Sequence, residues 1–96
     1  MQTNVTLHNT TLQILIDGHV SGISEVMELQ NIMKQHTEVN FIELIFPDAF
    51  VIPSALIGYL LRVIKVDKKT VQIKAQRQEL RDLINDLNLS SVLNIS

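Results

Sequence analysis

The residues of this chain that could do chemistry are few and widely spaced. The three histidines are His8, His19 and His36, and no two of them stand four apart, the spacing that puts a pair of metal ligands on one helix face. The chain has no cysteine, no glycine-rich phosphate loop and no nucleophile elbow. We therefore expect no catalytic residue, no metal site and no cofactor.

The paired carboxylates Asp82 and Asp86 are the other arrangement that could suggest catalysis. They stand four residues apart in a helical pattern, on the side opposite Leu83 and Leu87. Carboxylates on a solvated helix face lack the burial that prepares a carboxylate for catalysis. We interpret this pair as part of a solvent-exposed surface.

Composition and charge exclude several classes of protein. The 96 residues are 46% hydrophobic and 19% charged, which fits one globular domain over residues 1–96. The formal net charge of −2 removes the basic surface that phosphate-backbone binding requires, so no nucleic acid partner is expected. The apolar stretch at residues 49–61 is interrupted and shorter than the about 18 residues that a membrane span needs. With no signal-peptide pattern at the start, we expect a cytoplasmic protein without direct membrane insertion.

Residue patterning predicts alternating strands and helices. Two β-rich runs, residues 4–8 and 11–16, flank Asn9-Thr10 and indicate a hairpin. The remaining segments are expected to be strands at 41–46, 71–75 and 92–95 and helices at 25–37, 54–66 and 78–88. Strands joined through helices pair in parallel, so the order β-β-α-β-α-β-α-β predicts a small single-domain α/β fold with a mixed sheet and helices packed on it.

Several local features are expected of these elements. Ser24 and Ser54 stand where N-caps of the first two helices would be. The nearly continuous apolar run at 41–46 is typical of an interior strand covered on more than one side. Leu83 lies at the centre of a narrow apolar stripe in the third helix, and His36 can bond the terminal carbonyls of the first.

The helix that opens at Ser54 is apolar around more of its circumference than packing on one side of a sheet requires. The excess surrounds Ile57 and Leu61. Either the first helix covers these side chains or they meet a partner.

The segment F-V-I-P-S-A-L at residues 50–56, which follows the strand FIELIF, resembles the STAS family, the sulphate-transporter and anti-sigma factor antagonist domains. In that family an apolar pair is followed by Asp, Ser, Ser or Thr, Gly and Leu, and the second hydroxyl residue is a phosphorylation site at a helix start. Ser54 matches that residue, and Phe50, Val51 and Leu56 match the apolar positions. The family's Asp, first Ser and Gly are replaced here by Ile52, Pro53 and Ala55.

A second match is the segment I-D-G-H-V-S at residues 16–21, which is similar to the family's strand-ending turn. Gly18 and Val20 match its pattern, and Ser21 stands where the family has an aspartate. The resemblance covers nearly the whole chain in element order and length, and it implies a STAS-like fold.

The resemblance also implies a non-catalytic regulatory protein, similar to anti-sigma factor antagonists. Such family members bind an anti-sigma factor with serine-kinase activity, or other STAS proteins, and phosphorylation releases them. The implied phosphorylation site is Ser54. The implied partner-binding residues are His19, Ser21, Ile52, Pro53, Ser54, Ile57 and Leu61.

Alternatives remain open for Ser54 and for the function. From the residues alone, Ser54 is an N-cap whose backbone bond is worth about 1 kcal/mol. A phosphate at a helix start is also favourable, because the dipole and free N–H groups stabilise it. The alternatives to a phosphorylation-switched antagonist are a constitutive STAS scaffold subunit and an accessory STAS domain of a membrane lipid or solute transport complex.

Overall fold

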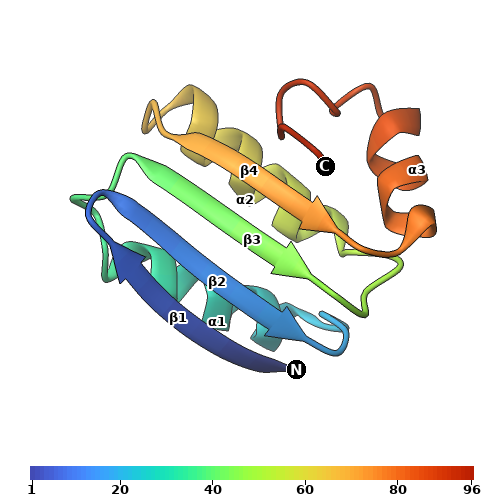
Figure 1. Ribbon diagram of the computed structural model, residues 1–96, viewed down its shortest axis with the longest axis horizontal. Helices are drawn as coiled ribbons and strands as arrows, with labels where there is room; N and C mark the ends of the chain where they lie inside the picture. Colours follow the sequence, from blue (N-terminus) through green and yellow to red (C-terminus); the bar gives the residue numbers. More distant parts are fainter.

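Four strands form one mixed sheet whose order in space follows the order along the chain (Figure 1). The computed structural model describes residues 1–96. β1 (Gln2–His8) pairs antiparallel with β2 (Thr11–Asp17), and β3 (Phe41–Phe46) and β4 (Thr70–Ala75) follow in parallel. The α/β class and the mixed sheet expected from the sequence are confirmed.

The predicted hairpin is confirmed, with strands slightly longer than expected. Asn9 adopts a left-handed conformation with φ of 55°, which asparagine tolerates better than most residues. Gly18, with φ of 83°, turns the chain at the end of β2.

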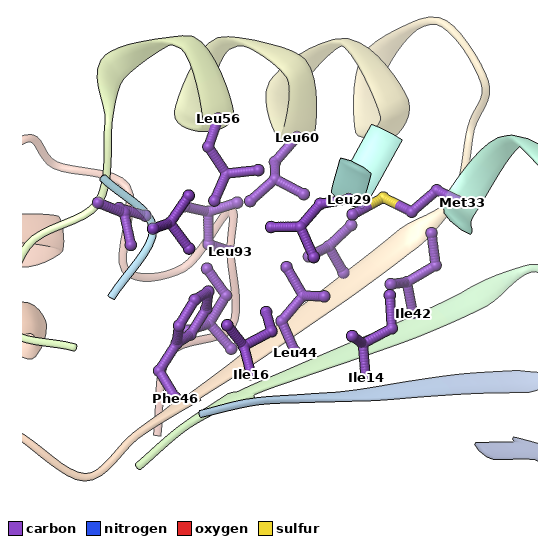
Figure 2. Packing of buried hydrophobic residues seen from close by; sticks show 14 of the residues in the cluster. Ile14, Ile16, Leu29, Met33, Ile42, Leu44, Phe46, Leu56, Leu60 and Leu93 are labelled. Carbon is purple, nitrogen blue, oxygen red and sulfur yellow. The ribbon is translucent and has the colours of Figure 1, made fainter. Parts of the chain in front are cut away.

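Helices α1 (Ile23–Lys34) and α2 (Ser54–Lys65) cover one face of the sheet, while α3 (Gln78–Asp86) lies beside the end of β4 (Figure 1). Figure 2 shows Leu56 and Leu60 of α2 pointing toward Leu44 and Phe46 of the sheet. All the buried hydrophobic residues belong to one core cluster. Every second residue of β2, β3 and β4 enters this core, as the alternation of a strand requires.

The opposite face of the sheet carries no helix (Figure 1). On that face the carboxylate of Glu43 accepts a hydrogen bond from Gln13 Nε2 at 2.6 Å and lies 3.3 Å from Lys74 Nζ. Ile45 on the same face is half-buried. The prediction of an interior strand is confirmed, since β3 lies between β2 and β4. The expected cover on more than one side is wrong, because helices cover only one face (Figure 1) and Glu43 on the other face contacts Gln13 and Lys74.

Helix α1 begins earlier than predicted, and its N-cap is Gly22 rather than Ser24. Glu25 accepts hydrogen bonds from both the backbone N–H and the hydroxyl of Ser21. This reach from the first turn of the helix back to the preceding loop holds the helix start without a serine cap. The helix ends at Lys34, three residues before the predicted end.

Helix α3 ends at Asp86, two residues before the predicted end. Asn88 adopts φ of 59°, and its N–H donates to the Asn85 carbonyl at 2.9 Å. The N–H of Leu89 donates to the Ile84 carbonyl at 3.1 Å. These two bonds and a left-handed asparagine form a Schellman motif, which ends the helix.

Helix α3 packs through Leu80 and Ile84, which are both fully buried. Leu83, expected at the centre of the apolar stripe, is half-buried. Asp82 and Asp86 are exposed, as expected.

The chain after α3 covers the outer edge of β4 without forming a strand. The strand predicted at 92–95 is reduced to a single parallel bridge between Ile73 and Ile95. Residues 90–94 form turns, and Asn94 has φ of 48°, which is incompatible with an extended strand. Leu93 from this segment is nevertheless fully buried and joins the core (Figure 2).

Candidate protein-interaction surface

Three loops meet at the edge of the sheet where the parallel strands end. Residues 18–22 follow β2, residues 47–53 follow β3, and residues 76–77 follow β4. Because these strands are parallel, their carboxyl ends lie along the same edge (Figure 1). In open α/β sheets this edge is where binding sites usually lie.

Phe50 links the three loops. Its ring meets the His19 ring edge to face, with centroids 4.9 Å apart and planes 72° apart. The Arg77 Cζ atom lies 5.9 Å from the Phe50 centroid, within the range of a cation–π contact. Asp48 Oδ2 accepts a hydrogen bond from the Gly18 N–H at 2.9 Å. Phe50 is still 43% exposed, so its ring faces solvent where the loops meet.

The exposed residues His19, Phe50, Val51 and Ser54 are called the loop-end surface below. Val51 is 52% exposed, and with Phe50 it gives this surface an apolar centre. Exposed apolar side chains that adjoin polar groups are a common feature of protein-binding surfaces.

Arg77 is held beside this surface by Glu79. The two side chains make a two-pronged contact, with Nη2 to Oε2 at 3.0 Å and Nε to Oε1 at 3.4 Å. The hydrogen bond from Arg77 lowers the pKa of Glu79. Both side chains are exposed, so this pair orients the guanidinium more than it stabilises the fold.

Ser21 is exposed, but its polar groups are engaged within its own loop. Its backbone N–H and its hydroxyl both lie 2.7 Å from Glu25 Oε1. The hydrogen bond from the Ser21 hydroxyl is the main cause of the lowered pKa of Glu25. A partner that bound Ser21 would have to compete with Glu25 for this hydroxyl.

Ser54 is the first residue of α2 rather than its N-cap, which corrects the sequence prediction. The N-cap is Pro53, whose extended backbone (φ −64°, ψ 146°) carries no side-chain cap bond. The Pro53 carbonyl accepts the N–H groups of Leu56 and Ile57, so the helix begins one residue before a Ser54 cap would place it. The Ser54 hydroxyl is exposed and makes no hydrogen bond, and the N–H groups of Ser54 and Ala55 have no protein acceptor.

Ile52 lies in the core, with 6% of its surface exposed, and Pro53 is half-buried. The sequence grouped both with the partner-binding residues because they stand at functional positions of the STAS motif. In the structure Phe50 and Val51 occupy the exposed positions of this loop instead.

Ile57 and Leu61 lie on the flank of α2 that faces away from α1. On the opposite flank, Tyr59 and Arg62 line a cleft of about 240 Å³ together with Gln30 of α1. The first helix therefore does not cover Ile57 and Leu61. Ile57 is half-buried and packs on the core, whereas Leu61 is half-buried outside the core cluster.

The three histidines are not brought together. His8 is exposed on β1, and His36 lies just beyond α1, with its Nδ1 3.0 Å from the Ile32 carbonyl, as its position predicted. No three histidine, aspartate or glutamate side chains are grouped so that they could hold a metal ion.

None of the helices has the length and apolar character needed to cross a membrane.

Asp48 and Arg77 support the loop-end surface through their contacts with Gly18 and Phe50, and neither residue was predicted from the sequence. Each is the second residue after the end of a parallel strand, β3 for Asp48 and β4 for Arg77. That position is the signal that could have identified them, because such residues meet at one edge of the sheet.

Comparison with models of protein families, with curated proteins and with solved structures finds no match to this chain. The loop-end surface and the motif at residues 50–56 are the features of this chain that bear on its function.

Proposed function

We propose that this protein is a non-catalytic, STAS-like regulatory module that binds a protein partner through the loop-end surface and the first turns of α2. The partner implied by the sequence resemblance is an anti-sigma factor with serine-kinase activity, or another STAS protein. The element order supports the proposal, since a β-hairpin is followed by successive helical crossovers to parallel strands.

The observation that carries the proposal is the state of Ser54. Its hydroxyl is exposed and free of hydrogen bonds, and it stands three residues after the exposed Val51. A kinase could reach this hydroxyl without breaking an intramolecular bond. The site thus combines a free acceptor of phosphate with an apolar contact surface.

A phosphate on Ser54 would be stabilised by the helix and would change the surface strongly. The free N–H groups of Ser54 and Ala55 and the dipole of α2 favour an anion at this position. The phosphate would add about −1.5 to −2 charges beside Phe50 and Val51. We expect that charge to weaken binding of an acidic or apolar partner surface.

Binding of a small molecule is less well supported than binding of a protein. The two clefts of the molecule, of about 390 and 240 Å³, are each lined mostly by polar side chains, whereas small-molecule pockets are mostly apolar. Neither cleft includes a residue of the loop-end surface.

The proposal is tested with Ser54→Asp and Ser54→Ala. The partner is first isolated by affinity purification from the native cell and identified by mass spectrometry. Calorimetric titration should then show weaker binding for Ser54→Asp than for Ser54→Ala, because only the aspartate adds negative charge. Ser91→Asp is the matched control, since it adds the same charge at an exposed serine of the C-terminal segment.

The same titration distinguishes the switched module from a constitutive scaffold. A scaffold is favoured by one observation: Ile52, which replaces the family's aspartate, is buried and offers a kinase no acidic contact. Equal affinities of the alanine and aspartate variants, together with no phosphate on Ser54 in the purified native protein, would show that the switch is absent. Loss of affinity in Ser91→Asp alone would place the interface elsewhere.

A further inference from the structure

We propose that the free edge of β1 pairs with β1 of a second copy of this chain, forming an antiparallel dimer with two-fold symmetry. The surface involved is the outer edge of the sheet rather than the loop-end surface. The inference is therefore independent of the proposed function.

The two edges of the sheet are treated differently by the fold. The outer edge of β4 is covered by the C-terminal segment, through hydrogen bonds from Ser96 N–H to the Ile73 carbonyl at 3.0 Å and from Ala75 N–H to the Ser96 carbonyl at 3.1 Å. In Figure 1 no element lies outside β1 at the other edge. An uncovered edge strand is a template for pairing with another chain.

The backbone groups that β1 leaves free follow from its register with β2. The hairpin closes on the pair His8 and Thr11 after a two-residue turn, so these two residues exchange backbone hydrogen bonds. Bonded pairs then recur at every second residue of β1. The residues between them, Thr3, Val5 and Leu7, direct their N–H and C=O groups away from β2.

These three residues are self-complementary about Val5. An antiparallel two-fold axis at Val5 places Val5 opposite Val5 of the second copy, and Thr3 opposite Leu7 of the second copy. Each of these pairs can exchange two hydrogen bonds, so all the free backbone groups of the three residues find partners. A C2 interface requires such a self-complementary patch.

The side chains on the edge fit the same register. Val5 is 42% exposed and Leu7 is 48% exposed, on the face of the sheet that the helices cover. Pairing about Val5 would bury part of both, and Val5 would contact its own symmetry mate. Cross-strand pairs of this kind are the unit of sheet stabilisation.

The composition of β1 does not oppose pairing with a second copy. The segment QTNVTLH has no Lys, Arg, Asp or Glu, so two copies oppose no like formal charges at neutral pH. It also has no proline and no bulge, and its pairing with β2 is continuous over all seven residues. In natural monomeric proteins, edge strands usually carry a charge, a proline or a bulge that prevents pairing with another chain, and β1 has none of these.

Sedimentation equilibrium of the whole chain tests the dimer, over concentrations from micromolar to near-millimolar because one strand per copy makes a small interface. The expected mass at the upper end is twice the chain mass of 10.9 kDa. Amide hydrogen exchange should show protection at Thr3, Val5 and Leu7 that increases with protein concentration. Protection at Asn4 and Thr6 should not depend on concentration, because these amides already bond to β2.

Two variants identify the edge as the interface. Val5→Pro removes an outward N–H, which an edge strand tolerates, and should yield a monomer whose unfolding midpoint is close to that of the wild type. Val5→Lys places two ammonium groups across the axis and should weaken the dimer several-fold, less so at high salt. Ser91→Lys is the matched control, since it adds the same charge at an exposed serine of the segment that follows α3 and covers the β4 edge, and it should leave the dimer intact.

A monomer at every concentration would overturn the proposal. It would also be overturned if Val5→Lys and Ser91→Lys dimerised equally well, since the copies would then meet through another surface. Concentration-dependent protection outside β1 alone would lead to the same conclusion.

Discussion

At the scale of single residues, the free hydroxyl of Ser54 separates its role in binding from any role in stability. Because no cap bond is lost, Ser54→Ala should change the free energy of unfolding by less than about 0.5 kcal/mol, as measured by urea denaturation. Ser21→Ala, which loses the hydroxyl bond to Glu25, serves as the comparison and should lower the urea midpoint more than Ser54→Ala does. A loss of about 1 kcal/mol or more for Ser54→Ala would mean that the hydroxyl caps α2 in solution.

The second informative residue is Glu43, on the open face of the sheet. The hydrogen bond from Gln13, followed by the contact with Lys74, lowers the pKa of Glu43 despite its partial burial, which acts in the opposite direction. A carboxylate whose pKa is lower in the folded than in the unfolded state stabilises the fold above its unfolded pKa of about 4.3. That stabilisation is lost as the pH falls through the folded value.

Glu43→Gln should therefore be less stable than the wild type near neutral pH, and the difference should shrink as the medium is acidified. Urea midpoints of both proteins at roughly pH 3 to pH 7 measure it. Glu28→Gln, at an exposed position of α1, provides the control and should show little difference at any pH. A deficit of Glu43→Gln that stayed constant down to the lowest pH would show that the charge is not its cause.

At the scale of elements, α3 packs on the core through a narrow apolar face, and alanine substitutions at successive positions test which residues form that face. Ile84→Ala should cost about 2–5 kcal/mol of unfolding free energy, because Ile84 is fully buried. Leu83→Ala should cost less, since Leu83 is half-buried, and Leu87→Ala little, since Leu87 is exposed. The urea midpoints of the three variants measure these differences. If Leu83→Ala were the least stable, the face of α3 that packs on the core would not be the one formed by Leu80 and Ile84.

The elements themselves could be predicted well from the sequence, but their ends could not. Apolar periodicity locates the helices and strands, because the face of each element that packs on the core must be apolar along its length. Helix ends depend on which groups satisfy the terminal backbone. The Gly22 carbonyl accepts the Val26 N–H at the start of α1, and the Pro53 carbonyl accepts the first N–H groups of α2. The prediction of a last strand at 92–95 was wrong for a related reason. The alternation of apolar residues suggested an extended strand, but Asn94 adopts a left-handed conformation that turns the chain.

At the scale of the whole molecule, the position of the candidate site could be predicted, but its central contact could not. His19 and Ser54 both follow strands that were expected to be parallel, and the carboxyl ends of parallel strands lie at one edge of a sheet. The contacts of Phe50 with the His19 ring and the Arg77 guanidinium join three loops that are distant in the chain. No local pattern encodes such a contact, because it depends on how far each loop extends over the sheet.

The agreement between strand order in space and order along the chain has a consequence for synthesis on the ribosome. The two parallel strand pairings join residues at similar distances along the chain. Thr11 of β2 pairs with Phe41 of β3, 30 residues later, and Phe41 pairs with Thr70 of β4, 29 residues later. The hairpin can form as soon as it emerges, and each following crossover adds one strand to an edge that already exists. No pairing has to open to admit a later strand. The growing edge of the nascent sheet moves outward from β2 to β4, and the segment around Ile95, which emerges after β4, then covers that edge.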